Sequence, residues 1–204
     1  MAISRTQFET VRKELGAHTS WAVWSPVGAK PKSNVGDLSI FNDEDKLANS
    51  LEKLNPDIVL AGLNGSTGDV ATAMCVEPFS NFHSSWPRAT DYKIRFATAG
   101  TALEGAFMTD VIKHHIETDS NVVGRDLRKN PEYERSKVEE FFKEITTLSL
   151  SPIIFTFGVM GYELIQKYNV NRFKVYKLYH YAFTMSKEKF REETIKTLKI
   201  AGLA

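Results

Sequence analysis

The chain has 204 residues, 42% hydrophobic and 25% charged, a composition typical of one soluble globular domain with a sizeable core. Its net charge of +1 excludes a protein that is strongly basic over its whole surface, as some nucleic-acid-binding proteins are. The single cysteine, Cys75, excludes an internal disulfide, a cysteine-held iron–sulfur cluster and a cysteine-based zinc site. No apolar run approaches the ~20 residues that span a bilayer, so we expect no signal peptide, no membrane segment and a cytoplasmic location.

The first quarter of the chain is predicted to hold two helices and one short β-prone stretch. Residues 3–15 form a helix pattern that ends at Gly16, and the aromatic stretch 20–25 favours β structure. Residues 28–37 are rich in Gly, Pro and Lys and are predicted as a loop. A second helix is predicted over residues 43–54, with Asp43 or Asn42 as its N-terminal cap.

Four apolar runs follow and are predicted as strands, separated in the second half of the chain by helices. Their near-continuous apolar character, and the alternation with helices, predicts an α/β fold with a mostly parallel sheet covered on both faces. Asn130 and Ser186 are suited to cap two of the helices. The polar segment 114–136 is interpreted as a solvated loop rather than a lid or a DNA-contacting loop. The strands are expected at 57–62, 105–112, 151–158 and 173–180, and the helices at 132–148, 159–168 and 187–200.

Small polar residues follow the predicted strands, and in an open α/β sheet ligands bind at the carboxyl ends of the strands. We therefore expect a candidate site at one edge of the sheet. Its members are Gly62, Leu63, Asn64, Gly65 and Ser66 after the first strand, Thr109 and Asp110 on the second, Gly158 after the third, and His180 and Tyr181 after the fourth.

Each of these side chains has a functional and a structural interpretation. The Asn64 amide could orient a water molecule or a substrate group, or Asn64 could be only a turn residue. His180 could donate a hydrogen bond to developing negative charge, or be a structural histidine. Asp110 could act as a base or accept a hydrogen bond from a ligand N–H group, or cap the next segment.

Other patterns are weaker. Aromatic residues in the stretch 77–86, which also holds His83, could stack on a planar ligand, although core packing is the favoured interpretation. His114 and His115 are adjacent and would point to opposite faces of a strand, so no metal site is expected. The loop 62–69 lacks the Gly-Lys-Ser/Thr ending of a phosphate loop. The excess of basic residues over 171–204 fits a solvated helix face better than a binding surface.

The order of these motifs resembles the uracil-DNA glycosylase superfamily, especially its mismatch-specific branch. Gly62-Leu63-Asn64-Gly65-Ser66 is similar to that family's Gly-x-Asn/Asp/Ala-Pro motif, and Asn81-Phe82-His83 is similar to an Asn-Arg-Phe-Trp-like segment. Residues 107–113 resemble a strand of the form hydrophobic-Thr-Asn-hydrophobic-hydrophobic-Lys, and His180-Tyr181-Ala182 stands where the family has His-Pro-Ser. The resemblance covers about residues 57–190 and rests on order and spacing more than on identity.

The resemblance implies a single domain over residues 1–204, a three-layer α/β/α sandwich with a central, mostly parallel, four-stranded sheet, on which residues 1–55 pack as an N-terminal extension. It implies a protein that binds DNA, flips a damaged base out of the duplex into a pocket and cleaves its glycosidic bond. We expect this protein to be a monomer and to need no metal or cofactor. By position, Asn64 would orient the attacking water and His180 would stabilise charge on the departing base. Phe82 would stack on the base, Asp110 would read its hydrogen-bonding edge, and Gly62, Leu63, Gly65, Ser66 and Tyr181 would complete the pocket. Tyr181, Phe183 or Met185 would press into the DNA.

The chain departs from the family pattern at chemically important positions. Gly65 replaces a proline, Asp110 stands where an asparagine commonly reads uracil, and the Pro-Ser after His180 is missing. An ionised aspartate only accepts hydrogen bonds, so it would repel O4 of uracil. Three functions remain open: a base-excising DNA glycosylase, a catalytically silent protein of the same fold that binds a nucleotide or nucleic acid, and a hydrolase of small nucleosides or nucleotides.

Overall fold

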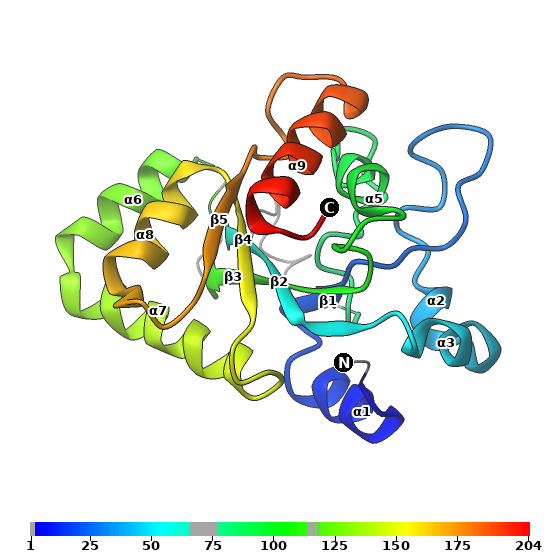
Figure 1. Cartoon of the computed structure of the whole chain (residues 1–204), viewed down its shortest axis with the longest axis horizontal. Helices are drawn as coiled ribbons and strands as arrows, with labels where there is room; N and C mark the ends of the chain where they lie inside the picture. The colour runs from blue at the N-terminus through cyan, green and yellow to red at the C-terminus, as the bar shows by residue number, and fades with distance from the viewer. Residues whose placement is uncertain (1–2, 66–76, 114–116, 118) are drawn as a thin grey trace.

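The computed structural model describes residues 3–65, 77–113, 117 and 119–204. Four residues named above, Ser66, Cys75, His114 and His115, lie outside the described residues. Figure 1 shows the chain, with helices lying on both sides of a central sheet. None of the helices in the described part is long and apolar enough to cross a membrane.

The sheet has five strands in the described part of the chain, in the order β1-β3-β2-β4-β5. Strands β2, β3, β4 and β5 are parallel, which confirms the predicted mostly parallel sheet. The expectation of four strands is wrong by one, because Thr19–Trp21 pairs antiparallel with the edge of β3. This stretch is β-prone, but three fully buried residues show no alternation that would mark a strand. The strands are β1 (Thr19–Trp21), β2 (Asn55–Asn64), β3 (Ala106–Ile112), β4 (Ile153–Phe157) and β5 (Val175–Leu178).

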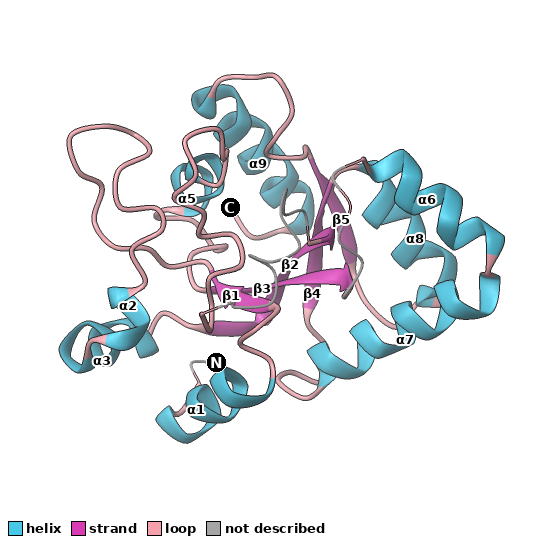
Figure 2. Cartoon of the chain, turned by 180° about the vertical axis from the view of Figure 1, so that it is seen from behind, coloured by secondary structure: helices cyan, strands magenta, loops and turns pink. Residues whose placement is uncertain are grey.

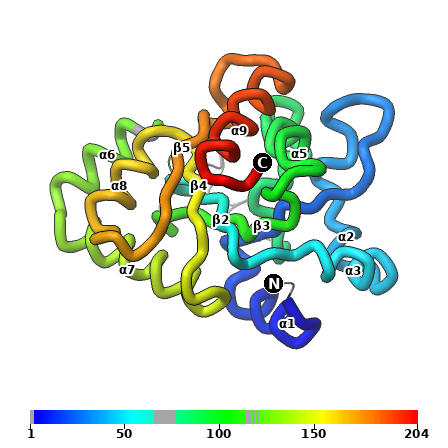
Figure 3. Tube along the Cα trace, in the orientation of Figure 1, coloured from blue at the N-terminus to red at the C-terminus, as the bar shows by residue number. Residues whose placement is uncertain are grey.

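The helices form layers on the two faces of the sheet, an arrangement compatible with a three-layer α/β/α sandwich. Figure 2 shows α6, α7 and α8 together on one side, and α5 and α9 on the other. The α5 and α9 helices are almost a hundred residues apart in sequence but lie side by side, as the tube in Figure 3 shows. The helices are α1 (Arg5–Glu14), α2 (Ser39–Asn42), α3 (Glu44–Leu51), α5 (Tyr92–Thr98), α6 (Ser120–Lys129), α7 (Pro131–Thr146), α8 (Val159–Asn169) and α9 (Lys187–Ala201).

The predicted helix caps are confirmed. The side chains of Asp43, Asn130 and Ser186 each accept a hydrogen bond from a backbone N–H in the first turn of the helix that follows. The predicted loop over 114–136 is wrong in its described part, because Ser120–Lys129 is the helix α6. Val123 and Leu127, four residues apart, bury one face of α6, and Asp119 caps its N-terminus.

Side chains of the central strands alternate between two core clusters. Val59, Ala61 and Leu63 face the cluster that contains α7, whereas Ile58 and Leu60 face the cluster that contains α5 and α9. The same alternation along β3 places Met108 on the α5 and α9 side. Gly62 and Asp110 are two residues beyond Leu60 and Met108, so the end of each strand presents them to that same side.

Candidate functional site

Gly62 and Asp110 lie side by side at the carboxyl ends of the two central strands. They are direct partners in the parallel register of β2 and β3. A Cβ atom added to Gly62 would overlap Oδ1 of Asp110 and lie 3.3 Å from Cζ of Phe82. Gly62 therefore leaves the space that the carboxyl group and the aromatic ring fill, and three residues predicted as a site are in contact.

The carboxyl group of Asp110 is buried and held by one amide. Its residue is 5% exposed, and its Oδ2 accepts a hydrogen bond of 2.9 Å from Nδ2 of Asn81. The same Nδ2 also donates to the backbone oxygen of His18, at 2.9 Å. Burial raises the pKa of Asp110 to about 6, against the opposing effects of the Asn81 hydrogen bond and the Lys113 charge. Asn81 is a site residue to which the sequence motif assigned no role.

A buried ion pair fixes the backbone beneath Asp110. Nζ of Lys113 lies 3.0 Å from Oε1 of Glu144 and donates to the backbone oxygen of Asp110 at 2.7 Å. Oγ1 of Thr109 donates to the same Glu144 oxygen at 2.7 Å. The two charged side chains are 5% and 9% exposed, so helix α7 anchors the end of β3 through a nearly water-free contact. Lys113 belongs to the motif at 107–113 but had no predicted role, and Glu144 was not predicted, since only the folded chain brings the two together.

Aromatic rings stand beside the carboxyl group. The ring centroid of Phe82 is 6.2 Å from those of Phe157 and Tyr181, and the latter two are 5.2 Å apart in an edge-on arrangement. Phe82 has a φ of +63°, an unusual value for a bulky residue, and the dense packing around its ring holds it there. Its ring is buried within the core, so the packing interpretation holds for this structure.

His180 and Tyr181 follow β5 and reach the same edge of the sheet. The imidazole stacks on the Tyr181 ring at a centroid distance of 4.5 Å, and a Cβ on Gly158 would lie 3.6 Å from its Cδ2 atom. Nδ1 of His180 accepts a hydrogen bond of 3.1 Å from the backbone N–H of Ala182, so the neutral ring carries its hydrogen on Nε2. Burial lowers the pKa of His180, which keeps the ring neutral at pH 7.

The hydroxyl of Tyr181 is also shifted by its surroundings. Burial raises its pKa well above the ordinary value, and the carboxyl groups of Asp91 and Asp110 raise it further. The hydroxyl therefore stays protonated and uncharged at neutral pH. Gly62, Phe82, Asp110, His180 and Tyr181 thus form one linked cluster, in which ring contacts join the histidine to the phenylalanine beside the carboxyl group.

The residues around Asn64 have a different environment. Asn64 is the last residue of β2, and its Nδ2 donates to the backbone oxygens of Gly65, at 3.1 Å, and of Glu117, at 2.8 Å. Leu63 is buried in the core cluster on the α7 side of the sheet. An added Cβ on Gly65 would meet no atom of the described residues within 4 Å. The described contacts of Asn64 join it to the segment before α6 rather than to the Asp110 and His180 cluster.

His83 belongs to the core. Its ring lies 4.9 Å from Trp24 and 5.4 Å from Phe41, and burial lowers its pKa to about 4. Among the residues that the structure describes, no three or more histidine, cysteine, aspartate or glutamate side chains gather in a way that could hold a metal ion.

Comparison of the sequence with protein-family models gives no match, and comparison with curated proteins finds no relative.

Proposed function

We propose that this chain is a DNA glycosylase-like protein that hydrolyses the N-glycosidic bond of a damaged or deaminated base. One observation carries the proposal: a buried carboxyl group, aromatic rings and a neutral histidine of fixed tautomer lie together at the carboxyl edge of a parallel sheet. Open α/β sheets bind ligands at this edge, and the three kinds of group match the needs of base recognition and base departure. The motif order that resembles the uracil-DNA glycosylase superfamily supports the same assignment.

In the proposed reaction a water molecule adds to C1′ of the deoxyribose, and the N-glycosidic bond breaks. The bonding electron pair leaves with the base, which departs as an anion, and the water loses a proton to solvent. The Nε2–H of His180 donates a hydrogen bond to an oxygen of that anion. A neutral histidine suits this role, because it can donate without first releasing a proton.

Asp110 sets the preferred base in this proposal. Above a pH of about 6 its carboxylate only accepts, so a base presenting an N–H donor is favoured. Below that pH the protonated carboxyl group can donate to an oxygen such as O4 of uracil. We therefore expect release of uracil to increase as the pH falls through 6, and release of a donor-bearing base to decrease.

The loop after His180 supplies the element that enters DNA. Of the three aromatic or apolar residues expected there, Phe183 is 54% exposed, whereas Tyr181 and Met185 pack against the core. Nζ of Lys93 donates to the backbone oxygen of Phe183 at 2.9 Å and holds the loop against α5. Phe183 is thus the side chain we assign to unstacking the target base.

A second candidate function is a catalytically silent protein that binds a nucleotide or nucleic acid at the same edge. The contacts of Asn64 favour it, because both hydrogens of its amide are used on the backbone oxygens of Gly65 and Glu117. The ring of Phe82 is buried, so in either candidate a base can stack on it only after a neighbouring segment moves. Both candidates use the same cluster and differ in whether a bond is broken.

The deciding experiment is base release from labelled oligonucleotides that contain uracil, hypoxanthine or xanthine, single- and double-stranded, at pH 5.5 and 7.5. His180→Ala and Asn64→Ala test the two catalytic assignments, and Asn121→Ala, an exposed asparagine on α6, is the matched control. Release that His180→Ala reduces by about 100-fold or more supports the glycosylase. No release of any base by folded protein, with binding retained, favours the silent protein.

A further inference from the structure

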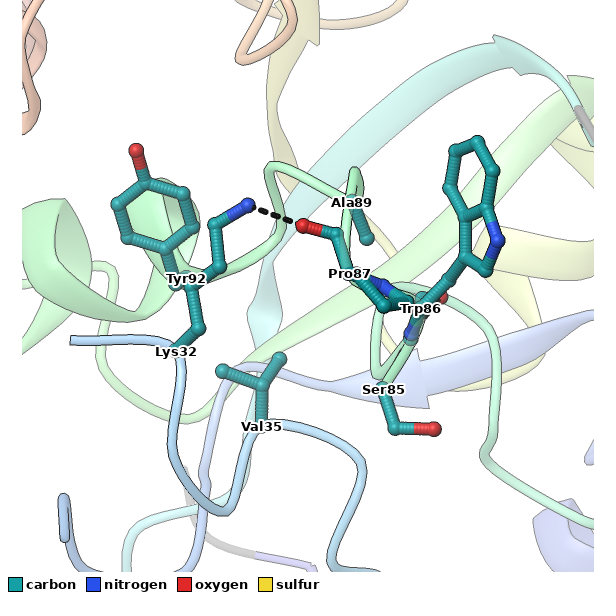
Figure 4. A pocket seen from close by; sticks show the side chains of 8 residues that line it. Lys32, Val35, Ser85, Trp86, Pro87, Ala89 and Tyr92 are labelled. Atoms are coloured by element: carbon teal, nitrogen blue, oxygen red, sulfur yellow. Dashed lines mark hydrogen bonds between the residues drawn. The ribbon is translucent and has the colours of Figure 1, made fainter. Parts of the chain in front are cut away.

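An exposed tryptophan closely follows Phe82 of the candidate site in the chain. Trp86 is four residues beyond Phe82, and its indole is 61% exposed. It borders a small recess of about 40 Å³. Figure 4 shows the Trp86 indole and the Tyr92 ring on opposite sides of the contact between Lys32 and Pro87. The recess is lined by Lys32, Val35, Ser84, Ser85, Trp86, Pro87, Ala89 and Tyr92.

Cations outnumber carboxyl groups around this recess, and the one carboxyl group that ends the first loop, Asp37, accepts a hydrogen bond from the backbone N–H of Ser39. The loops that form it, residues 26–36 and 84–90, contain Lys30, Lys32 and Arg88 but no aspartate or glutamate. The Arg88 guanidinium lies 5.9 Å from the centroid of the Trp86 ring, and the Lys32 ammonium 5.3 Å from that of Tyr92. Asp91, the next carboxyl group along the chain, is turned inward and accepts from the backbone N–H of Ser84.

Both loops are held in place by hydrogen bonds to backbone oxygens. The guanidinium of Arg95 donates to Ser33 at 2.8 Å and to Pro31 at 2.6 Å. The Lys32 ammonium donates to Pro87 at 2.6 Å and joins one loop to the other. The aromatic and cationic side chains are therefore presented by a preformed surface, which reduces the entropic cost of binding a ligand.

The start of α5 links the recess to the loop that we assign to DNA entry, because Tyr92 lines the recess. Lys93 follows Tyr92 directly, and it holds the backbone of Phe183. One turn of α5 thus contributes both to the recess and to the contact that holds Phe183. Exposed aromatic rings interleaved with cations are the usual platform for unpaired bases, because rings stack on bases while cations meet phosphates.

We propose that Trp86 is a stacking platform for an unpaired base of a DNA strand, and that Arg88 and Lys32 bind its neighbouring phosphates. This inference rests on the proposed function, in that DNA is the ligand, but it concerns a surface outside the cluster of Asp110 and His180. It makes single-stranded DNA, or a strand opened beside the flipped base, the preferred form of the ligand.

Intrinsic fluorescence tests the proposal directly. Trp21 is fully buried and Trp24 is partly buried, so Trp86 is the tryptophan most open to quenching by a ligand. The probe is an unmodified oligothymidylate of about ten nucleotides, within the usual span of such sites. We expect it to quench the emission, Trp86→Ala to weaken binding at least fivefold, and Trp86→Phe to retain most of the affinity. Arg88→Ala should lower the slope of log affinity against log salt by about one.

The controls separate this proposal from the proposed function. Leu150→Ala removes another highly exposed side chain and should leave binding unchanged. Base excision without quenching, or oligothymidylate binding that Trp86→Ala leaves unchanged, overturns the platform and leaves the glycosylase standing. Quenching with a loss of affinity in Trp86→Ala, but no excision of any base, supports the platform and refutes the glycosylase. A shift of oligomeric state in Trp86→Ala, without any effect on DNA binding, would assign the ring to a protein interface instead.

Discussion

Asp110→Asn is expected to change how stability depends on pH. The aspartate ionises near pH 3.8 in an unfolded chain and near pH 6 in the folded protein, because burial disfavours its charged form. The folded state therefore binds this proton more tightly than the unfolded state. The resulting stabilisation is complete below pH 3.8 and is lost as the pH rises through 6. Asparagine does not titrate, has a similar shape and keeps an oxygen that accepts from Asn81.

The size of the effect follows from the shift of about two pKa units. Each unit corresponds to about 1.4 kcal/mol, so the native carboxylate costs about 3 kcal/mol at neutral pH relative to its protonated form. The free energy of unfolding of Asp110→Asn, minus that of the unchanged protein, should rise by about 3 kcal/mol between pH 3.5 and pH 8. The charges of other groups are common to both proteins and drop out of this difference.

Urea denaturation followed by circular dichroism, at five or six pH values, measures the difference. Asp37→Asn is a suitable control, because the backbone N–H of Ser39 lowers the pKa of Asp37 and the trend should reverse. In that control the unchanged protein gains stability over the variant as the pH rises through the titration of Asp37. A difference for Asp110→Asn that stays constant within about 0.5 kcal/mol would refute a buried, proton-binding carboxyl group.

Three further substitutions test the framework of the site, each by urea denaturation. Asn81→Ala should destabilise the protein by about 1–3 kcal/mol, because it removes the hydrogen-bond donor of a buried carboxylate oxygen. It should also raise the pKa of Asp110 above 6, which a carboxyl ¹³C NMR titration measures. An unchanged pKa would contradict the contact between Asn81 and Asp110. Lys113→Met should lower the free energy of unfolding by about 3–5 kcal/mol, because it leaves Glu144 buried and unpaired. Lys53→Met breaks the more exposed pair with Glu104 and should lower it by less than about 1 kcal/mol. Equal effects would mean that the pair of Lys113 and Glu144 is solvated. Gly62→Ala should cost about 1–3 kcal/mol through overpacking against Asp110, and a neutral result would place the carboxyl group elsewhere.

The parallel strands could be predicted because their chemistry is local. Residues 58–61 are continuously apolar and are followed by Gly62, so the sequence alone predicts burial on both faces. Helix α5 could not be predicted in this way, since it buries Lys93 and Arg95. Those two cations bond to backbone oxygens of Phe183 and Pro31, which lie about 90 and 60 residues away in the chain. Contacts of that length leave no periodic pattern.

In the candidate site, too, residues marked by a local pattern could be predicted, and residues defined by long-range contacts could not. The rule that ligands bind at strand carboxyl ends was enough to select Gly62, Asp110 and His180, because each stands at the end of an apolar run. The sequence predicts no role for Asn81, since its amide contacts Asp110 only when the loop before α5 folds back onto β3. The environment of Asn64 also cannot be predicted from the sequence, because Glu117 comes from the segment that leads into α6, for which the sequence pattern predicts a loop.

The pairing of β1 with β3 has a consequence for the order of events during synthesis. Thr19–Trp21 leaves the ribosome almost ninety residues before Phe107–Thr109, the segment with which it pairs. The Asn81 amide likewise joins the backbone of His18 to a carboxyl group on β3. The segment Thr19–Trp21 therefore remains unpaired with β3 until β3 is complete. Long-range pairings of this kind form slowly, and the unpaired segments are prone to aggregate in the meantime. The completion of β3 is thus the earliest moment at which the N-terminal part of the chain can acquire its final structure.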